Sequence, residues 1–208
     1  MSSRPRAEMI EATRARLIAS ARQAFARLGY AKTSMDDLTA EAGLTRGALY
    51  HHFGDKQGLL AAVVEQIDGE MDQRLEAISS EVADPWEAFC QRCQAYLEMA
   101  LEPEIQRIVL QDARAVLGDV TQAGEDQCID TLGTLLGRLI QEQVIEPASP
   151  QALARLINGS LVEAALWIAN APQPAQKLEE SRVGLQLILR GLRRDNRSPS
   201  ADTTPASE

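Results

Sequence analysis

Apolar residues recur at three- and four-residue steps through almost all of this 208-residue chain, and glycine or proline separates the runs. This spacing is the period of one face of an α-helix. Aromatic residues, which favour strands, make up only 4% of the chain, and no segment alternates as a half-buried strand does. The pattern therefore predicts an all-α fold of about nine helices.

Two short helices joined by a glycine turn stand out near the N-terminus. Ser34 is a natural N-cap for the first, about Met35 to Ala42, which stops at Gly43. Thr45 caps the second, Arg46 to His52. Such a pair forms a helix-turn-helix, whose second helix enters the major groove of DNA.

The exposed face of the second short helix is expected to carry side chains suited to DNA. Arg46 can donate to guanine O6 and N7 as a bidentate pair, and Gly47 lets the backbone approach a base or sugar edge. Hydroxyls, and a lysine at a helix N-terminus, bind phosphates. The predicted DNA-binding residues are Thr33, Ser34, Thr45, Arg46, Gly47, Tyr50, His51 and Lys56. Further phosphate or minor-groove contacts are expected from Arg4, Arg6, Arg14 and Arg16.

The distribution of charge agrees with a DNA-binding N-terminus, although the whole chain has a net charge of -9. Residues 1–56 contain nine Lys/Arg and six Asp/Glu, whereas residues 57–208 contain twelve and twenty-four. A basic N-terminal part can approach phosphates while an acidic remainder stays away from them.

The rest of the chain is predicted to form a helical ligand-binding and dimerisation domain, residues 56–194, behind a DNA-binding domain of residues 1–55. Residues 195–208 are mostly Ser, Thr, Pro, Asp and Ala with nothing to pack, so we expect a disordered tail. No apolar run approaches the roughly 18 residues of a membrane span, and the basic N-terminus lacks the apolar core of a signal peptide. These features predict a cytoplasmic protein without a membrane partner. The expected helices of the second domain are 56–80, 85–101, 103–118, 121–143, 151–170 and 175–194.

The sequence offers no set of residues for catalysis or for a metal. It has no Ser/His/Asp arrangement and no Gly-rich phosphate loop, which argues against an enzyme and against a cofactor. The two histidines, His51 and His52, are adjacent on a helix and point about 100° apart, so they cannot easily share a metal. Cys90 and Cys93 have the spacing of a redox motif but lie within a predicted helix, which favours packing thiols. A thiol-sensing regulator, with Cys128 taking part, remains an alternative.

A few aromatic and charged side chains of the second domain are candidates for a ligand pocket, with core packing as the simpler interpretation of each aromatic. Glu163 lies in an apolar run, where a carboxylate must be exposed, paired or in contact with a ligand. If it shares a cavity with Trp167, a cationic, lipophilic effector is favoured. The candidate ligand-binding residues are Trp86, Phe89, Tyr96, Asp112, Glu163 and Trp167.

Residues 10–62 resemble the N-terminal part of the TetR (tetracycline-repressor-like) family. The matching positions are Phe25, Gly29-Tyr30, Thr33-Ser34, Ala42-Gly43, Gly47 to Phe53, and Lys56 with Leu59-Leu60. The resemblance implies a dimeric all-helical repressor, in which the last two helices, 151–170 and 175–194, form a four-helix bundle between subunits and the middle helices enclose a ligand cavity. Such a dimer would bind a palindromic operator in double-stranded DNA and leave it when an effector, which the sequence does not identify, binds. A regulator without an effector would use the same helix-turn-helix.

Overall fold

The computed structural model describes residues 4–118 and 122–194, and within them the chain is helical throughout, as predicted. The elements are α1 (Arg4–Leu28), α2 (Met35–Ala42), α3 (Arg46–Phe53), α4 (Lys56–Ser80), α5 (Pro85–Met99), η1 (Ile105–Ala113), α6 (Arg114–Leu117), α7 (Gln122–Gln141), α8 (Pro150–Ala169) and α9 (Pro174–Arg190). In this part of the chain, extended pairing is limited to a single bridge between Ile145 and Arg193. The predicted disordered tail, 195–208, lies outside the described residues.

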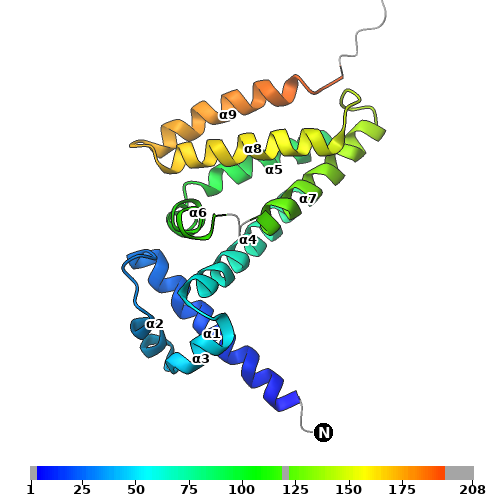
Figure 1. Ribbon diagram of the computed structural model, residues 1–208. Helices are drawn as coiled ribbons and strands as arrows, with labels where there is room; N and C mark the ends of the chain where they lie inside the picture. Colours follow the sequence, from blue (N-terminus) through cyan, green and yellow to red (C-terminus); the bar gives the residue numbers. More distant parts are fainter. Residues whose placement is uncertain (1–3, 119–121, 195–208) are drawn as a thin grey trace, which may run out of the picture.

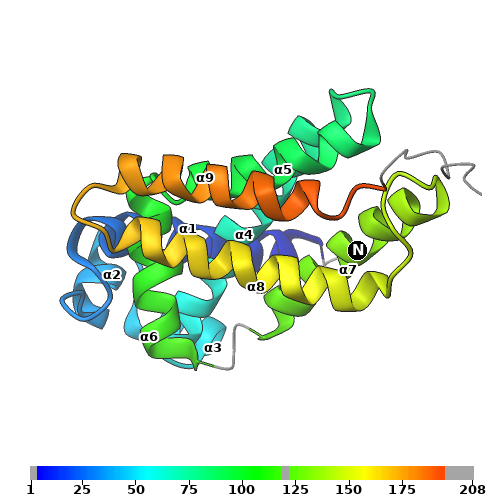
Figure 2. The same ribbon diagram turned by 90° about the horizontal axis from the view of Figure 1, so that it is seen from above.

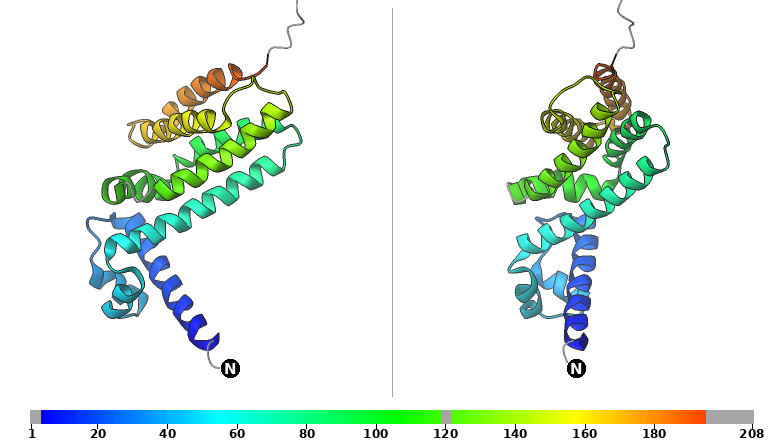
Figure 3. Two further views of the ribbon diagram at one scale, coloured as in Figure 1. Left: turned by 45° about the vertical axis from the view of Figure 1, so that its right-hand side comes forward. Right: turned by 90° about the vertical axis from the view of Figure 1, so that its right-hand side faces the viewer.

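Helices α1 to α3 form one end of the molecule, which we call the head (residues 4–55; Figures 1 and 3). The apolar faces of the three helices meet at Leu17, Phe25, Leu38 and Leu49, all essentially inaccessible to solvent. Packing of this kind fixes the angle between the two short helices, because side chains in a core interdigitate with few voids.

The expected caps of the two short helices are present. The Ser34 hydroxyl accepts a hydrogen bond from the backbone N–H of Asp37 (3.1 Å), and the Thr45 hydroxyl accepts one from Ala48 (3.2 Å). Gly43 ends α2 with a φ of 61°, a left-handed conformation that glycine adopts at little cost. Local sequence signals therefore determine the helix-turn-helix.

Helix α4 leads from the head into the remaining helices, which we call the body (residues 56–194; Figure 1). It packs against α1 and α3 near its start and against α5 and η1 further along. In the body, α8 lies between α7 and α9, and Figure 2 shows α8 and α9 side by side on the face of the molecule opposite the head.

The segment after α5 differs from its prediction. A single α-helix was expected over 103–118, but Ile105–Ala113 (η1) is π-helical and only Arg114–Leu117 (α6) is an α-helix. A π-helix, in which hydrogen bonds join residues five apart, is rare and occurs mostly at functional sites. Segment η1 contacts α1, α4 and α8, so it lies between the head and the centre of the body.

Helix α8 corrects the expectation that no segment could span a membrane. By length and composition it could do so, with a mean hydropathy of 1.3 and 33% of its most apolar window buried. Core helices of soluble proteins pass the same test, so one such helix is weak evidence. Together with α9, however, it leaves large apolar side chains exposed: Leu156, Trp167, Val183, Leu187 and Ile188.

Candidate functional site

The exposed surface of α3 contains most of the predicted DNA-binding residues. Leu49 points into the core of the head and is fully buried, which turns the opposite face of the helix outward. Tyr50 is 52% exposed, a large value for an aromatic side chain that has no function at the surface. The exposed residues of this surface are Thr45, Arg46, Gly47, Tyr50 and His51.

Arg46 is oriented by a partner on the neighbouring helix. Its Nε and Nη2 atoms donate to the two carboxylate oxygens of Asp36 on α2, and both side chains are exposed. The hydrogen bonds from Arg46 lower the pKa of Asp36 below its usual value. In this fork-to-fork geometry the guanidinium is held in one plane before DNA arrives.

Three predicted phosphate ligands have other contacts within the head. Thr33 is 2% exposed and its hydroxyl donates to the carbonyl of Gly29 (2.9 Å), so the expected role at the surface is wrong. The ammonium of Lys56 donates to the carbonyl of Tyr30 and lies 4.1 Å above the centre of its ring, and burial lowers the pKa of this lysine. Ser34 caps α2.

Two of the α1 arginines expected at phosphates also have contacts inside the head. Arg16 donates to the carbonyl of Ala42 at the end of α2 (2.6 Å), and the Arg14 guanidinium lies 5.7 Å from the centre of the Phe53 ring. Arg6 is exposed on the first turns of α1. The side chain of Arg4 lies outside the described residues.

A cavity of about 630 Å³ lies in the body, lined by α4, α5, η1, α7 and α8. Its volume suits a drug-sized ligand. Of the six candidate ligand residues, Tyr96 and Glu163 line this cavity.

The other four candidate ligand residues lie elsewhere. Trp86 and Phe89 are buried against each other, with ring centres 6.2 Å apart, and belong to the core as the simpler interpretation held. Trp167 is 49% exposed on the outer face of α8, where the Lys177 ammonium lies 4.7 Å from its ring centre. The expectation that Trp167 shares the cavity with Glu163 is therefore wrong. Asp112 is also absent from the cavity wall, because it contacts the backbone of Tyr30 in the head.

Four polar residues of the cavity wall were not predicted: Asp68, Asp72, Arg92 and Asn158. Asp68 on α4 has no hydrogen bond or ion pair with any described residue, and burial, reinforced by the charge of Asp72, raises its pKa to about 6. Asn158 on α8 is 6% exposed and its amide is also unpaired within the described part of the chain. Arg92 on α5 is buried, with Asp72 at 3.7 Å and Glu76 at 3.5 Å.

The turn after α1 is bound directly to η1. The carboxylate of Asp112 accepts a hydrogen bond from the backbone N–H of Tyr30 (2.7 Å), which is why this residue is absent from the cavity wall. Arg107 donates to the carbonyl of Leu28 (3.4 Å). Gly29 has a φ of 80°, a conformation that favours glycine, and the Arg107 guanidinium occupies the space beside it.

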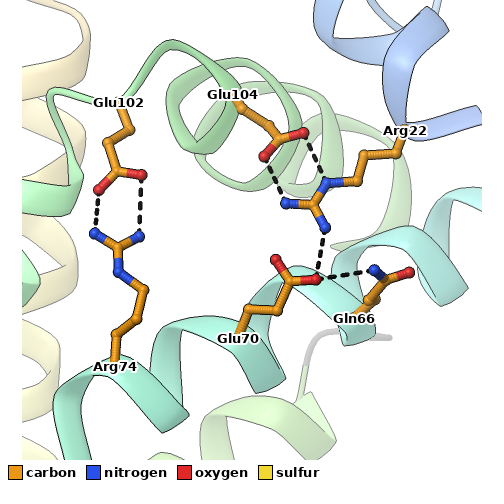
Figure 4. Close-up of polar contacts among 6 residues, drawn as sticks. All are labelled: Arg22, Gln66, Glu70, Arg74, Glu102 and Glu104. Atoms are coloured by element: carbon orange, nitrogen blue, oxygen red, sulfur yellow. Dashed lines mark hydrogen bonds and ion pairs between the residues drawn. The ribbon is translucent and has the colours of Figure 1, made fainter. Parts of the chain in front are cut away.

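A second contact joins the head to the body through Arg22 of α1 (Figure 4). Its Nε and Nη2 atoms donate to Glu104, at the start of η1 (2.8 and 2.7 Å), and its Nη1 atom donates to Glu70 of α4 (2.7 Å). These hydrogen bonds hold the pKa of Glu70 below its ordinary value. A neighbouring pair, Arg74 with Glu102, lies wholly within the body.

The body cysteines behave as packing residues. Burial raises the pKa of the Cys93 thiol to about 12 and that of Cys90 to about 11, so both are thiols rather than thiolates at neutral pH. A thiol is a poor nucleophile and a poor metal ligand. Across residues 4–118 and 122–194, no group of three His, Cys, Asp or Glu side chains could hold a metal ion.

Two family models match the chain, one in its N-terminal part and one in the body. Residues 17–63 match the model described as bacterial regulatory proteins, tetR family, and residues 86–192 match the tetracyclin repressor-like C-terminal domain. Together they include α3 and most of the cavity wall.

Individual proteins agree with the family models. The crystal structure of a TetR-family transcriptional regulator from Pectobacterium atrosepticum is 60% identical, with a TM-score of 0.84 over 89% of this chain and 96% of that one. The transposon Tn10 TetC protein from Escherichia coli is 26% identical over 82% of this chain and 87% of its own length. A complex of SmeT with triclosan has a TM-score of 0.69 and 26% identity, and covers 95% of this chain and all of that one. The chain therefore belongs to the TetR family and is an all-helical, DNA-binding transcriptional regulator rather than an enzyme.

Proposed function

We propose that this protein is a cytoplasmic repressor that binds a palindromic operator as a homodimer and leaves it when a small molecule occupies the body cavity. The observation that carries this proposal is the position of η1. Val109 and Leu110 of this segment line the cavity, while Arg107 and Asp112 of the same segment contact the turn after α1. A ligand that moves η1 must therefore change the contact between body and head.

The thermodynamics of this coupling is reciprocal. If the ligand favours a state in which the heads are wrongly placed for DNA, then bound DNA weakens the ligand by the same factor. Repression relieved by ligand is the sign of the effect that we propose. SmeT, which shares this fold, forms a complex with triclosan, and this supports a small-molecule effector here.

The dimer is proposed to form through α8 and α9. Leu187 and Ile188 of α9 are 63% and 54% exposed, and Leu156 of α8 is 69% exposed. Burial of such side chains is favourable at about 25 cal/mol per Å² of apolar surface. A second copy placed against this face would bring two α3 helices to one DNA duplex, as half-sites about 34–36 Å apart require.

Two alternatives predict different observations. A thiol sensor needs a reactive thiolate, and the raised pKa values of Cys90 and Cys93 disfavour one. A regulator without an effector needs a sealed core, and the cavity of about 630 Å³ disfavours that arrangement.

The experiment begins with duplex DNA selected by the purified protein from a random-sequence pool. We expect a palindromic consensus, and we expect Arg46→Ala combined with Tyr50→Ala to weaken binding to it by about 100-fold or more, because a bidentate contact and its neighbour are lost. Arg138→Ala removes an exposed charge from α7 and should leave binding unchanged. Sequence-selective binding that survives in the double variant would overturn the proposed interface.

A further inference from the structure

The charged groups of the cavity wall do not balance. Of the arginines that line it, Arg92 is occupied by Asp72 and Glu76, and Arg114 at the start of α6 has an exposed side chain. The carboxylate of Asp68 has neither as an ion-pair partner, nor any other described residue. Within the described residues, the wall therefore contains a negative charge without a neutralising partner.

Asp68 lies where a ligand can reach it. It lines both the cavity of about 630 Å³ and a second pocket of about 650 Å³, which extends toward the head past His52 and Phe53. Gly124 of α7 lies next to Asp68. A Cβ added to this glycine would be 3.6 Å from an Asp68 carboxylate oxygen. The carboxylate is half-buried and lines the cavity, so a ligand there can contact it.

The side-chain amide of Asn158 is a second polar group in the wall of the same cavity. It is 6% exposed and comes from α8, a helix whose other wall residues include Leu161 and Ala165. Its side-chain amide makes no hydrogen bond with the described residues. Neither polar atom of this amide is sealed from solvent, so both face the cavity space. The amide is therefore available to a ligand.

We propose that the effector is an organic cation with a mainly apolar body, whose ammonium or amidinium group pairs with Asp68 while Asn158 accepts from or donates to a second polar atom. The apolar wall, which includes Met71, Ile105 and Leu132, takes the remainder of the molecule. A cation is selected because a half-buried, unpaired carboxylate gains most from an opposite charge that also donates hydrogen bonds. The inference rests on the proposed function, because the cation is taken to be the molecule that releases DNA.

The test uses three probes with one carbon skeleton: biphenylylbutylammonium, biphenylylbutanol and biphenylylbutanoate. Binding to the full-length protein is measured by calorimetry, without DNA. We expect the ammonium to bind at least about tenfold more tightly than the alcohol, and the carboxylate to bind most weakly. In the Asp68→Asn variant, the affinity for the ammonium should fall to that for the alcohol.

Control variants show whether the change in probe affinity in Asp68→Asn comes from the lost charge, from lost hydrogen bonding or from a damaged fold. Asp130→Asn makes the same change on an exposed position of α7 and should leave all three affinities unaltered. The probes carry no second polar atom for Asn158, so Asn158→Ala should leave the preference for the ammonium over the alcohol unchanged. The melting temperature of each variant without probe reports whether it is folded.

Each outcome bears on the proposal. Equal binding of ammonium and alcohol, a preference for the carboxylate, a preference that survives Asp68→Asn, or no binding of the ammonium would each overturn it. Release of the selected duplex by the alcohol or the carboxylate would leave the proposed regulator intact while excluding a cation. A failure of the protein to select any duplex would instead contradict the proposed function itself.

Discussion

The head and the body treat their polar side chains in opposite ways. On α3 the groups proposed to contact DNA, such as Tyr50 and His51, are exposed and remain hydrated until DNA replaces the water. In the body, the side chain of Asp68 is half-buried and Asn158 is 6% exposed, so the protein shields both from bulk water. Desolvated polar groups without partners cost stability in the free protein. A ligand that pairs with these groups removes this destabilisation, which adds to its binding free energy. The exposed groups of the head carry no comparable cost.

The contact between the two regions should give the largest effect on stability. Arg22→Met keeps the length of the side chain but removes three hydrogen bonds, which leaves Glu70 and Glu104 facing each other without a cation. Because the side chains of these carboxylates are 44% and 35% exposed, we expect a loss of about 2 kcal/mol in the free energy of unfolding, less than for a fully buried pair. Urea denaturation measures it.

Arg74→Met is the matched control for this prediction. It removes an ion pair to Glu102 of the same fork-like form, but both side chains are more exposed, 51% and 42%, and both belong to the body. The expected loss is below about 1 kcal/mol, as is usual for surface pairs. If both variants lose the same stability, the Arg22 contact does not hold the head on the body.

The destabilisation that the Asp68 carboxylate causes should be measurable as a gain in the free energy of unfolding of Asp68→Asn. Its pKa is raised from an ordinary value of 3.8 to about 6, so the folded chain holds this proton more tightly than the unfolded chain does. This linkage destabilises the wild type as the pH rises through that range, by at most about 3 kcal/mol once the group is ionised. We expect Asp68→Asn to be more stable than the wild type by about 1.5 kcal/mol near neutral pH, since the amide also costs something to bury.

The pH dependence identifies the source of that gain. At about pH 5 the carboxyl is largely protonated in the folded wild type, so the linkage penalty falls to roughly half and the constant cost of burying the amide cancels the advantage of Asp68→Asn. Below about pH 4 the variant should be the less stable of the two proteins. The two proteins share the charged and titratable neighbours His52, Glu65 and Asp72 around the same pockets and differ only at position 68. A gain that is constant with pH, or one matched by Asp130→Asn, would contradict this destabilisation by the Asp68 carboxylate.

The head was more predictable from the sequence than the body because its determinants are local. Ser34, Gly43 and Thr45 act on residues within a few positions of themselves, and all three do what their residue types favour at helix ends. Thr33 was misassigned although a local signal existed, since a hydroxyl four residues after the carbonyl of Gly29 can bond back to it.

The body depends on contacts between residues far apart in the chain. The carboxylate of Asp112 reaches the backbone of Tyr30 across 82 positions, and no spacing rule could reveal that. Trp167 was placed in the cavity because its helix is apolar all round, whereas α8 turns that side chain outward. The sequence did contain a signal for Asp68, which lies four residues after Val64 and three before Met71 on the apolar face of α4. The π-helical form of η1 had no such signal.

The smallest expected effect is in the head, where Asp36 pairs with Arg46. Asp36→Asn removes a negative charge beside the DNA-facing surface, so binding to random duplex should rise by about twofold to threefold at low salt. Binding to the selected operator should rise less, because Arg46 loses the partner that orients it, and the ratio of specific to random binding therefore falls. Glu41→Gln changes the charge of the same helix at an exposed position without touching Arg46, and should raise both affinities equally. Competition binding with the selected and random duplexes gives both ratios. If the two variants change specificity by the same amount, Asp36 acts only through its charge, and the orientation of Arg46 in the free head contributes nothing to recognition.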